Sequence, residues 1–312
     1  MSEKMDLVKK AIEMGHKIHE AAEAFDISRA SYYRHENGKN SVNGTKTASI
    51  FWLQRTISVR QGEDVGLNQI LEEIRSLIQQ HPFWGYRKVH AFLKFRRHYR
   101  IGKKRVHRIM KADGLMGEKK RFKPLRPMRS KPRANRPNQF WGTDMTKFLI
   151  PDLGWVSLVV VMDWYTKMVL GWSVGLIGNT DLWLDALDMA VKRAFPQDGS
   201  RGKGGKLISD NGSQPTSRRY REACKLLEIE QIWTTYDNPK GNADTERLIR
   251  TIKEEAIWPY ELTTFLQAKH HLEEKILFYN EQWCHMTLNN QSPVEFLNNY
   301  EQTERIRLVI NQ

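Results

Sequence analysis

Three acidic side chains, Asp144, Asp210 and Glu246, lie in three separate segments that are each expected to form regular structure. Asp144 lies in the strand-like stretch QFWGTDMTKFL. Asp210 follows apolar residues and precedes an Asn-Gly turn signal, so it is expected at the exit of a buried strand. Glu246 lies on GNADTERLIRTIKEE, whose periodicity predicts a helix from residue 241 to 255. Carboxylates on separate rigid elements offer the oxygen ligands that hard divalent cations require, and two such ions suit phosphodiester chemistry. We interpret the three acids as catalytic and metal-binding residues for two Mg²⁺ (or Mn²⁺) ions.

Each acid also has an ordinary structural explanation. Asp144 could be a polar residue at a strand edge, and Asp210 could accept a hydrogen bond within its own turn. Glu246 could simply face the positive end of a helix dipole from the first turn. The catalytic hypothesis is favoured because the spacing and the flanking residues agree. There are 35 residues between Asp210 and Glu246, and Lys253 follows two turns later on the same helix face, beside Arg250.

This pattern resembles the DDE motif of retroviral integrases and of insertion-sequence transposases of the IS-three family. The resemblance covers roughly residues 67–296 and includes a Trp before the first acid, SDNGSQ at the second, NPKGNAD before the glutamate and a closing YNEQWCHMTLNNQSPVEF. It implies an α/β fold with a ribonuclease-H-like integrase catalytic core, in which Asp144 lies mid-sheet on the first strand and Asp210 ends the adjacent fourth strand. Glu246 would arrive on a helix packed across the sheet edge.

The resemblance also implies cleavage of one DNA strand at an element end, attack by the freed 3′ hydroxyl and a circular DNA intermediate. One ion would be bridged by Asp144 and Asp210, and a second would be held by Asp144 and Glu246. Asp163 is a structural position in this family and is left out of the metal set. The chain departs from the family at Trp283, where an Arg two positions before the C-terminal His is usual.

The charge of the chain is concentrated in its first half. Residues 1–136 contain 31 Lys and Arg against 13 Asp and Glu, whereas the remainder contains 19 against 23. A basic half joined to a mildly acidic half indicates a region that grips a polyanion, by default nucleic acid, attached to an acid-lined catalytic region. The two cysteines form no Cys-x-x-Cys pair, and no apolar run reaches the length of a membrane span. We therefore expect a cytoplasmic, nucleoid-associated protein without a membrane partner.

Two helical segments precede the acids. The stretch AAEAFDISRASYYRHENG predicts helix, turn and helix, similar to a helix-turn-helix, although an ordinary helical hairpin is the alternative. Three further helices are expected from residue 67 to Gly114, with Trp84, Tyr86 and Leu93 in their core rather than as base-stacking platforms. Expected DNA-contacting residues are Arg29, Tyr33 and Arg34 in the first segment, Lys103, Lys104, Arg105 and Arg108 in the second, and Lys253 and Arg250 beside the acids.

A proline-containing basic stretch joins these helices to the acid-bearing region. It holds nine basic residues and one acid between residues 118 and 136, so it should be extended and track phosphates, although such a run can also be merely solvated. The residues singled out here are Arg121, Lys123, Arg126 and Arg129. The predicted divisions are a helix-turn-helix (1–36), a linker (37–66), a second helical DNA-binding domain (67–115), the basic linker (116–137), the catalytic core (138–260) and a C-terminal helix and tail (261–312).

Within the core, three antiparallel strands (140–149, 155–163 and 167–174) should precede alternating helices and strands. Residues 262–284 are expected to form one long helix, and residues 285–296 an extended closing segment. The run from 50 to 59 fits a helix or a strand equally well.

The sequence thus predicts a DDE transposase that binds double-stranded DNA, both its element's terminal repeats and target DNA, as a homo-oligomer. An upstream-frame helix-turn-helix partner is a further expectation from the family, because no sustained heptad repeat is present here. Two alternatives stay open: a DNA-binding regulator with an inactive integrase-like domain, and a ribonuclease-H-type nuclease that acts on hybrids.

Overall fold

The structure of the protein, a computed structural model, describes residues 2–14, 18–25, 58–60, 63–116, 133–196, 205–234 and 241–310. The chain divides into two compact units. The first contains residues 1–74 and 100–116, and the second contains residues 75–99 and 117–312. The second helix of the predicted N-terminal helix-turn-helix and residues 117–132 of the basic linker lie outside the described residues.

The first unit contains α1 (Ser2–Glu13), α2 (Ile18–Ala24), the antiparallel pair β1 (Ser58–Arg60) and β2 (Glu63–Val65), and α7 (Lys103–Ala112). The short strand β3 (Tyr99–Arg100) completes a small sheet of order β2-β1-β3. Val8 and Ala21 are buried against one another's helices. After α7, Gly114 has a φ of +74°, the left-handed conformation that commonly ends a helix. Of the undecided run 50–59, the described residues 58 and 59 are strand.

The helix α5 (Leu67–Gln80) begins in the first unit and ends in the second, which also contains α6 (Tyr86–Phe95). The helix α5 stops where the sequence places His81-Pro82, as expected. Trp84 and Leu93 are buried, as predicted, whereas Tyr86 is only half-buried.

A five-stranded mixed sheet forms the centre of the second unit, in the order β6-β5-β4-β7-β8. Its first three strands, β4 (Phe140–Ile150), β5 (Gly154–Asp163) and β6 (Val169–Gly175), are antiparallel. The strands β7 (Lys206–Ser209) and β8 (Glu230–Trp233) then extend the sheet in parallel from β4. This is the predicted ribonuclease-H-like order of three antiparallel strands followed by alternating helices and strands.

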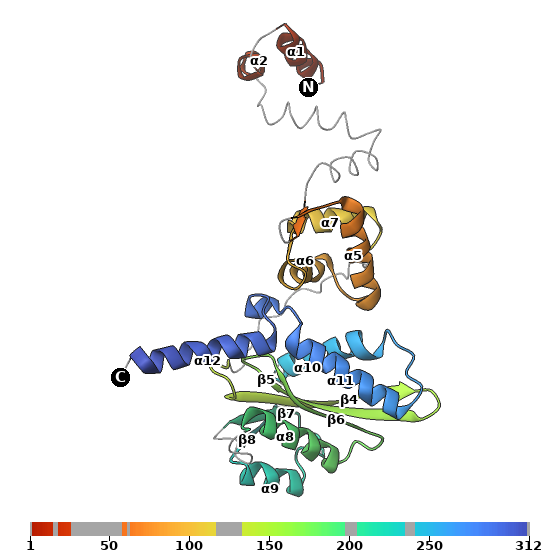
Figure 1. The fold of residues 1–312 in the computed structure, drawn as a ribbon, viewed down its shortest axis with the longest axis vertical. Coiled ribbons are helices and arrows are strands. Elements are labelled where there is room, and N and C mark those ends of the chain that lie inside the picture. The colour runs from red at the N-terminus through yellow and green to blue at the C-terminus, as the bar shows by residue number, and fades with distance from the viewer. Residues whose placement is uncertain are drawn as a thin grey trace. The chain divides into compact units, whose positions relative to one another are not determined.

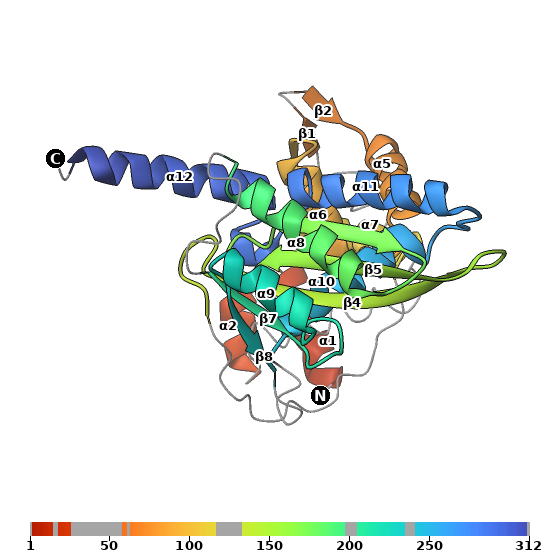
Figure 2. The same cartoon turned by 90° about the horizontal axis from the view of Figure 1, so that it is seen from below.

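Helices cover both faces of the sheet (Figures 1 and 2). The helices α8 (Thr180–Ala194) and α9 (Arg218–Leu226) pack on one face, and α10 (Ala243–Ile252) and α11 (Phe265–Glu281) pack on the other. Because both faces are covered, β5 is buried at consecutive positions from residue 156 to 163 and does not alternate. This explains the continuous apolar run of that strand.

The C-terminal region differs from the prediction of one extended closing segment. A single 3₁₀ turn, η2 (Met286–Leu288), is followed by α12 (Pro293–Ile310), an 18-residue helix whose C-terminal half extends beyond the sheet in both views. The start of α12 is a reciprocal cap, because Glu295 N donates to Ser292 Oγ (3.2 Å) and Ser292 N donates to Glu295 Oε2 (2.8 Å). The residues Ser-Pro-Val-Glu carry this signal, with proline at the first helical position.

The helix predicted from 241 to 255 is also interrupted. The α-helix α10 ends at Ile252, and a π-helical turn, η1 (Lys253–Ile257), continues it. Trp258 N donates to the carbonyl of Lys253 at 2.8 Å, five residues back. Among the helices that the structure describes, none combines the length and apolarity needed to cross a membrane.

Candidate active site

The sheet brings two of the three acids side by side. Asp144 lies within β4, opposite Val160 of β5, and Asp210 immediately follows β7. The strands β4 and β7 are parallel, with Phe140 paired to Lys206 and Gly142 paired to Ile208. The same register continued by two residues places Asp144 alongside Asp210.

The electrostatics of Asp144 connect it to both other acids. Burial, more than any other cause, raises the pKa of Asp144 to about 6. The charges of Asp210 and Glu246 raise this pKa further, whereas the hydrogen bond from Met145 N (2.7 Å) and the charge of Lys253 lower it. Three like charges that interact in this way create a negative potential that a divalent cation would relieve.

Glu246 is positioned by the docking of α10 on β4. Asn242 Nδ2 donates to the carbonyl of Thr143 (3.1 Å), and Trp164 Nε1 donates to Thr245 Oγ1 (3.2 Å). Asn242 and Thr245 are buried, whereas Glu246 in the same helical turn is exposed. The N-terminus of α10 is therefore fixed to Thr143, the neighbour of Asp144 in β4. The carboxylate of Glu246 is left accessible.

This close docking depends on Gly142. A Cβ atom at this position would lie 1.9 Å from Thr245 Oγ1 and 2.3 Å from Trp164 Nε1. Sequence reasoning missed Gly142, although an isolated glycine within a strand is a known signal for close approach of another backbone. In the structure Asn242 tethers β4, and Asp244 forms an ion pair with Lys167 (3.1 Å).

Asp210 makes the turn contact that its ordinary structural explanation anticipates. Gly212 N donates to Asp210 Oδ1 at 3.1 Å, and Asn211 Nδ2 donates to the carbonyl of Thr234 (2.9 Å). Asp210 is nevertheless exposed, so its second carboxylate oxygen stays accessible. A turn role and a ligand role are therefore compatible at this residue.

The three acids offer the oxygen ligands that a hard cation prefers, but their side chains are not arranged around a common point. Within the described residues, no three His, Cys, Asp or Glu side chains are arranged to hold a metal ion. Asp144 and Asp210 each direct one oxygen at a nearby backbone N–H. Their donor set consists entirely of carboxylate oxygens, as Mg²⁺ and Mn²⁺ prefer. A shared ion would require these carboxyl groups to rotate.

The expected DNA-contacting residues have different environments. Lys253 is half-buried and close enough to Asp144 to lower its pKa, whereas the exposed Arg250 forms an ion pair with Glu254 (2.9 Å). Lys103, Lys104 and Arg108 are exposed on α7, and burial lowers the pKa of Arg105. The other predicted contacts lie outside the described residues: Arg29, Tyr33, Arg34, Arg121, Lys123, Arg126 and Arg129.

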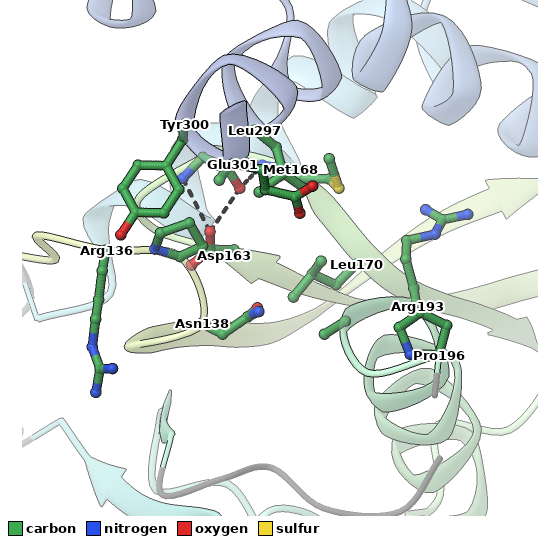
Figure 3. Close-up of a pocket in the computed structure, with 13 residues that line it drawn as sticks. Arg136, Asn138, Asp163, Met168, Leu170, Arg193, Pro196, Leu297, Tyr300 and Glu301 are labelled. Carbon is green, nitrogen blue, oxygen red and sulfur yellow. Dashed lines mark hydrogen bonds between the residues drawn. The ribbon is translucent and has the colours of Figure 1, made fainter. Parts of the chain in front are cut away.

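Asp163 pairs with Trp141 across β4 and β5, three positions along the strands from the pair formed by Asp144 and Val160. It is 1% exposed and accepts hydrogen bonds from Thr166 Oγ1 (2.6 Å) and Thr166 N (3.0 Å), which close the turn after β5. Figure 3 shows it at the wall of a cavity of about 340 Å³ that Tyr300 of α12 and Arg193 of α8 also line. This cavity thus lies beside the turn that follows β5, and none of the three acids lines it.

Comparison with known proteins identifies two domains. Residues 134–239 match the integrase core domain, and residues 67–123 match an HTH-like domain. Transposase InsD for insertion element IS2A/D/F/H/I/K of Escherichia coli is 28% identical over 235 residues, which cover 73% of this chain and 78% of that protein. Transposase InsD for insertion element IS2D of Escherichia coli strain K12 matches over the same lengths with the same identity.

Several solved structures of retroviral integrases also match. An intasome of simian T-cell lymphotropic virus, in complex with PP2A regulatory subunit B56 gamma, is 18% identical, covers 66% of this chain and 73% of its own, and has a TM-score of 0.47. The HTLV-2 integrase catalytic core, solved in complex with magnesium, is 15% identical, covers 53% and 99%, and has a TM-score of 0.41. The two domain matches and the InsD relatives agree with the motifs and with the sheet order. The chain resembles the insertion-sequence transposases of the IS-three family and combines an HTH-like domain with a ribonuclease-H-like integrase core.

Proposed function

We propose that this transposase binds the ends of its element and catalyses metal-dependent DNA strand cleavage and strand transfer, with Asp144, Asp210 and Glu246 as its catalytic acids. The observation that carries this proposal is the parallel register of β4 and β7, which places Asp144 alongside Asp210, together with the docking of α10 on β4, which brings Glu246 close enough to raise the pKa of Asp144. Turn contacts alone give no reason for Asp144 to lie within reach of two further acidic charges, since such repulsion destabilises the fold unless a ligand offsets it.

The residues of the chain have distinct roles in this proposal. Asp144 and Asp210 would hold one Mg²⁺ or Mn²⁺ ion, and Asp144 and Glu246 a second. When bound, such ions activate a nucleophilic oxygen and stabilise the leaving oxygen of a phosphodiester. The β4–β7 register and the docking of α10 fix the backbone around the acids, so that the reorganisation needed is a rotation of their carboxyl groups. Lys253, next to Asp144, would contact the phosphate that reacts.

The positive first half of the chain would provide most of the DNA affinity. The exposed lysines and Arg108 of α7 and the basic linker offer phosphate contacts. We further propose that the enzyme acts on the nucleoid in the cytoplasm as a homo-oligomer assembled on its terminal repeats, with target DNA as the second substrate. An upstream-frame helix-turn-helix protein would assist end recognition.

Nicking of a supercoiled plasmid tests the proposed chemistry. The purified full chain should convert supercoiled plasmid to nicked circles in Mg²⁺ or Mn²⁺ and should leave it intact in EDTA. Plasmid binding without nicking would instead identify a DNA-binding regulator with an inactive core. Faster cleavage of an RNA–DNA hybrid than of duplex DNA would identify a ribonuclease-H-type nuclease.

Four Gln substitutions in the basic linker should flatten the salt dependence of duplex DNA binding. The residues replaced are Arg121, Lys123, Arg126 and Arg129. Each phosphate contact contributes a slope of about 0.9 in the plot of log K against log salt, so four lost contacts should reduce the slope by roughly 3 to 4. Fluorescence anisotropy with a labelled duplex at several salt concentrations measures this slope. An unchanged slope would show that the linker is only solvated.

A further inference from the structure

A buried glutamate, Glu255, lies on the continuation of the helix that carries Glu246. Glu255 belongs to η1, nine residues after Glu246 and two after Lys253, and it is only 8% exposed. One of its oxygens accepts from His81 Nδ1 (2.6 Å), and the other accepts from Trp84 Nε1 (2.9 Å). Because a carboxylate can only accept, this contact places the imidazole proton on Nδ1. Both oxygens of Glu255 therefore have a partner.

The two donors are themselves held rigidly. The rings of His81 and Trp84 stack with their centroids 4.0 Å apart and their planes 8° apart, and Phe278 of α11 stacks on His81 at 5.2 Å. Trp283 contacts Trp84 edge to face at 5.6 Å. The hydrogen bonds to Glu255 thus come from a packed aromatic cluster whose members cannot follow if the glutamate moves.

A lysine completes the surroundings of Glu255. Lys88 Nζ lies 3.0 Å from the centroid of the Trp283 ring, a close cation–π contact. Burial lowers the pKa of Lys88 to about 7, and the charge of Glu255 opposes this shift. A buried carboxylate with two hydrogen-bond donors and a nearby cation strongly favours one position, because displacement would leave its charge unpaired in an apolar cluster.

The location of Glu255 gives this cluster a consequence for catalysis. The π-helical turn changes the direction in which side chains leave the helix, and such turns occur frequently at functional sites. Glu255 points into the cluster of His81 and Trp84, while the same continuous helix presents Glu246 and Lys253 to Asp144. The angular setting of the catalytic helix is therefore fixed at its N-terminus by β4 and at its C-terminal end by Glu255.

We propose that Glu255 is a positioning residue, which fixes the rotation of the helix carrying Glu246 and Lys253 through its hydrogen bonds to His81 and Trp84. The inference rests on the proposed function of these two residues. It makes residues 81–88, which lie within the HTH-like match, a necessary part of the catalytic unit.

Substitutions of Glu255 separate positioning from simple loss of charge. Glu255→Ala removes both acceptors and should lower the turnover of plasmid nicking by roughly tenfold to a hundredfold, the range expected for a small misplacement of a catalytic group. Plasmid affinity should stay within about twofold. Glu255→Gln should restore most of the turnover, since its amide can accept from Trp84 and donate to the other tautomer of His81. Glu273→Ala, at an exposed glutamate of α11, is the matched control.

Two further measurements keep the test independent of folding and of the proposed function. Trp84→Phe keeps the ring but removes one donor, so it should cause a smaller loss, and in combination with Glu255→Ala it should add little. Amide hydrogen exchange of residues 253–258 should accelerate in Glu255→Ala and stay near the wild-type rate in Glu255→Gln, whether or not the wild type nicks DNA. Equal losses of turnover in the Ala and Gln variants, or unchanged exchange in Glu255→Ala, would overturn the positioning role. A wild type that does not nick would overturn only the proposed function.

Discussion

Glu246→Gln is expected to abolish plasmid nicking and strand transfer while DNA binding stays intact. The substitution keeps the size of an exposed side chain on α10 and removes only its charge, so the fold should be unaffected. Loss of one carboxylate ligand removes several kcal/mol of transition-state stabilisation, and each 1.4 kcal/mol is a factor of ten. Turnover should therefore fall by roughly a thousandfold or more. Nicking assays with Mg²⁺ and anisotropy with a labelled duplex measure the two properties separately.

Asp144→Asn and Asp210→Asn should give the same separation of binding from catalysis. Asp188→Asn is a suitable control, because Asp188 is an exposed acid of α8 that pairs only with Lys192 of its own helix in the described structure (2.6 Å). If Glu246→Gln retained a tenth or more of the nicking activity with a folded protein, Glu246 would not be a metal ligand. The assignment of the three acids would then fail.

Gly142→Ala should inactivate the enzyme although no catalytic group is changed. The added methyl group would lie 1.9 Å from Thr245 Oγ1, closer than any real contact, so α10 or Trp164 must shift. Overpacking of this kind costs about 1–3 kcal/mol of stability, and a displacement of Glu246 by about 1 Å costs on the order of a hundredfold in rate. We expect roughly a hundredfold lower turnover per folded molecule, measured by nicking after the folded fraction has been determined by thermal unfolding.

Gly171→Ala provides the comparison for Gly142→Ala. A Cβ atom there would lie 2.1 Å from the carbonyl oxygen of Ala186 in α8, so it should destabilise the fold at least as much. The helix α8 carries none of the three acids, and folded Gly171→Ala protein should therefore nick at close to the wild-type rate. Equal turnover losses in the two variants would show that Gly142 supports only the fold.

The strands, and the placement of Asp144 within one and Asp210 just after another, could be predicted because their signals are local. Asp210 lies between an apolar pair and an Asn-Gly turn, and β4 to β6 carry the β-branched and aromatic residues of strands with turn residues between them. Once the family order of strands was recognised, the approach of Asp144 to Asp210 followed from parallel pairing alone. The helix α12 was missed although its capping residues Ser292 and Glu295 were visible in the sequence.

The remaining features depend on contacts between distant residues. His81 and Glu255 are 174 positions apart, and nothing near either residue distinguishes this buried pair from two solvated side chains. The π-helical turn at Lys253 is likewise fixed by what Glu255 contacts, because the local sequence continues a normal helical periodicity. The role of Trp283, which stands where the family usually has Arg, also depends on tertiary contacts. Its ring packs on Lys88 and Trp84.

The boundary between the two units has a consequence for how such elements evolve. Residues 75–99 belong to the unit that contains the integrase core, while residues 67–74 and 100–116 belong to the other unit. Recombination between insertion elements at residue 134, where the integrase match begins, would separate Glu255 from its native partners His81 and Trp84. The glutamate of one parent would then fit the donor residues of the other parent only by chance. Viable chimaeras of this lineage should therefore inherit residues 75–99 and the catalytic core from the same parent.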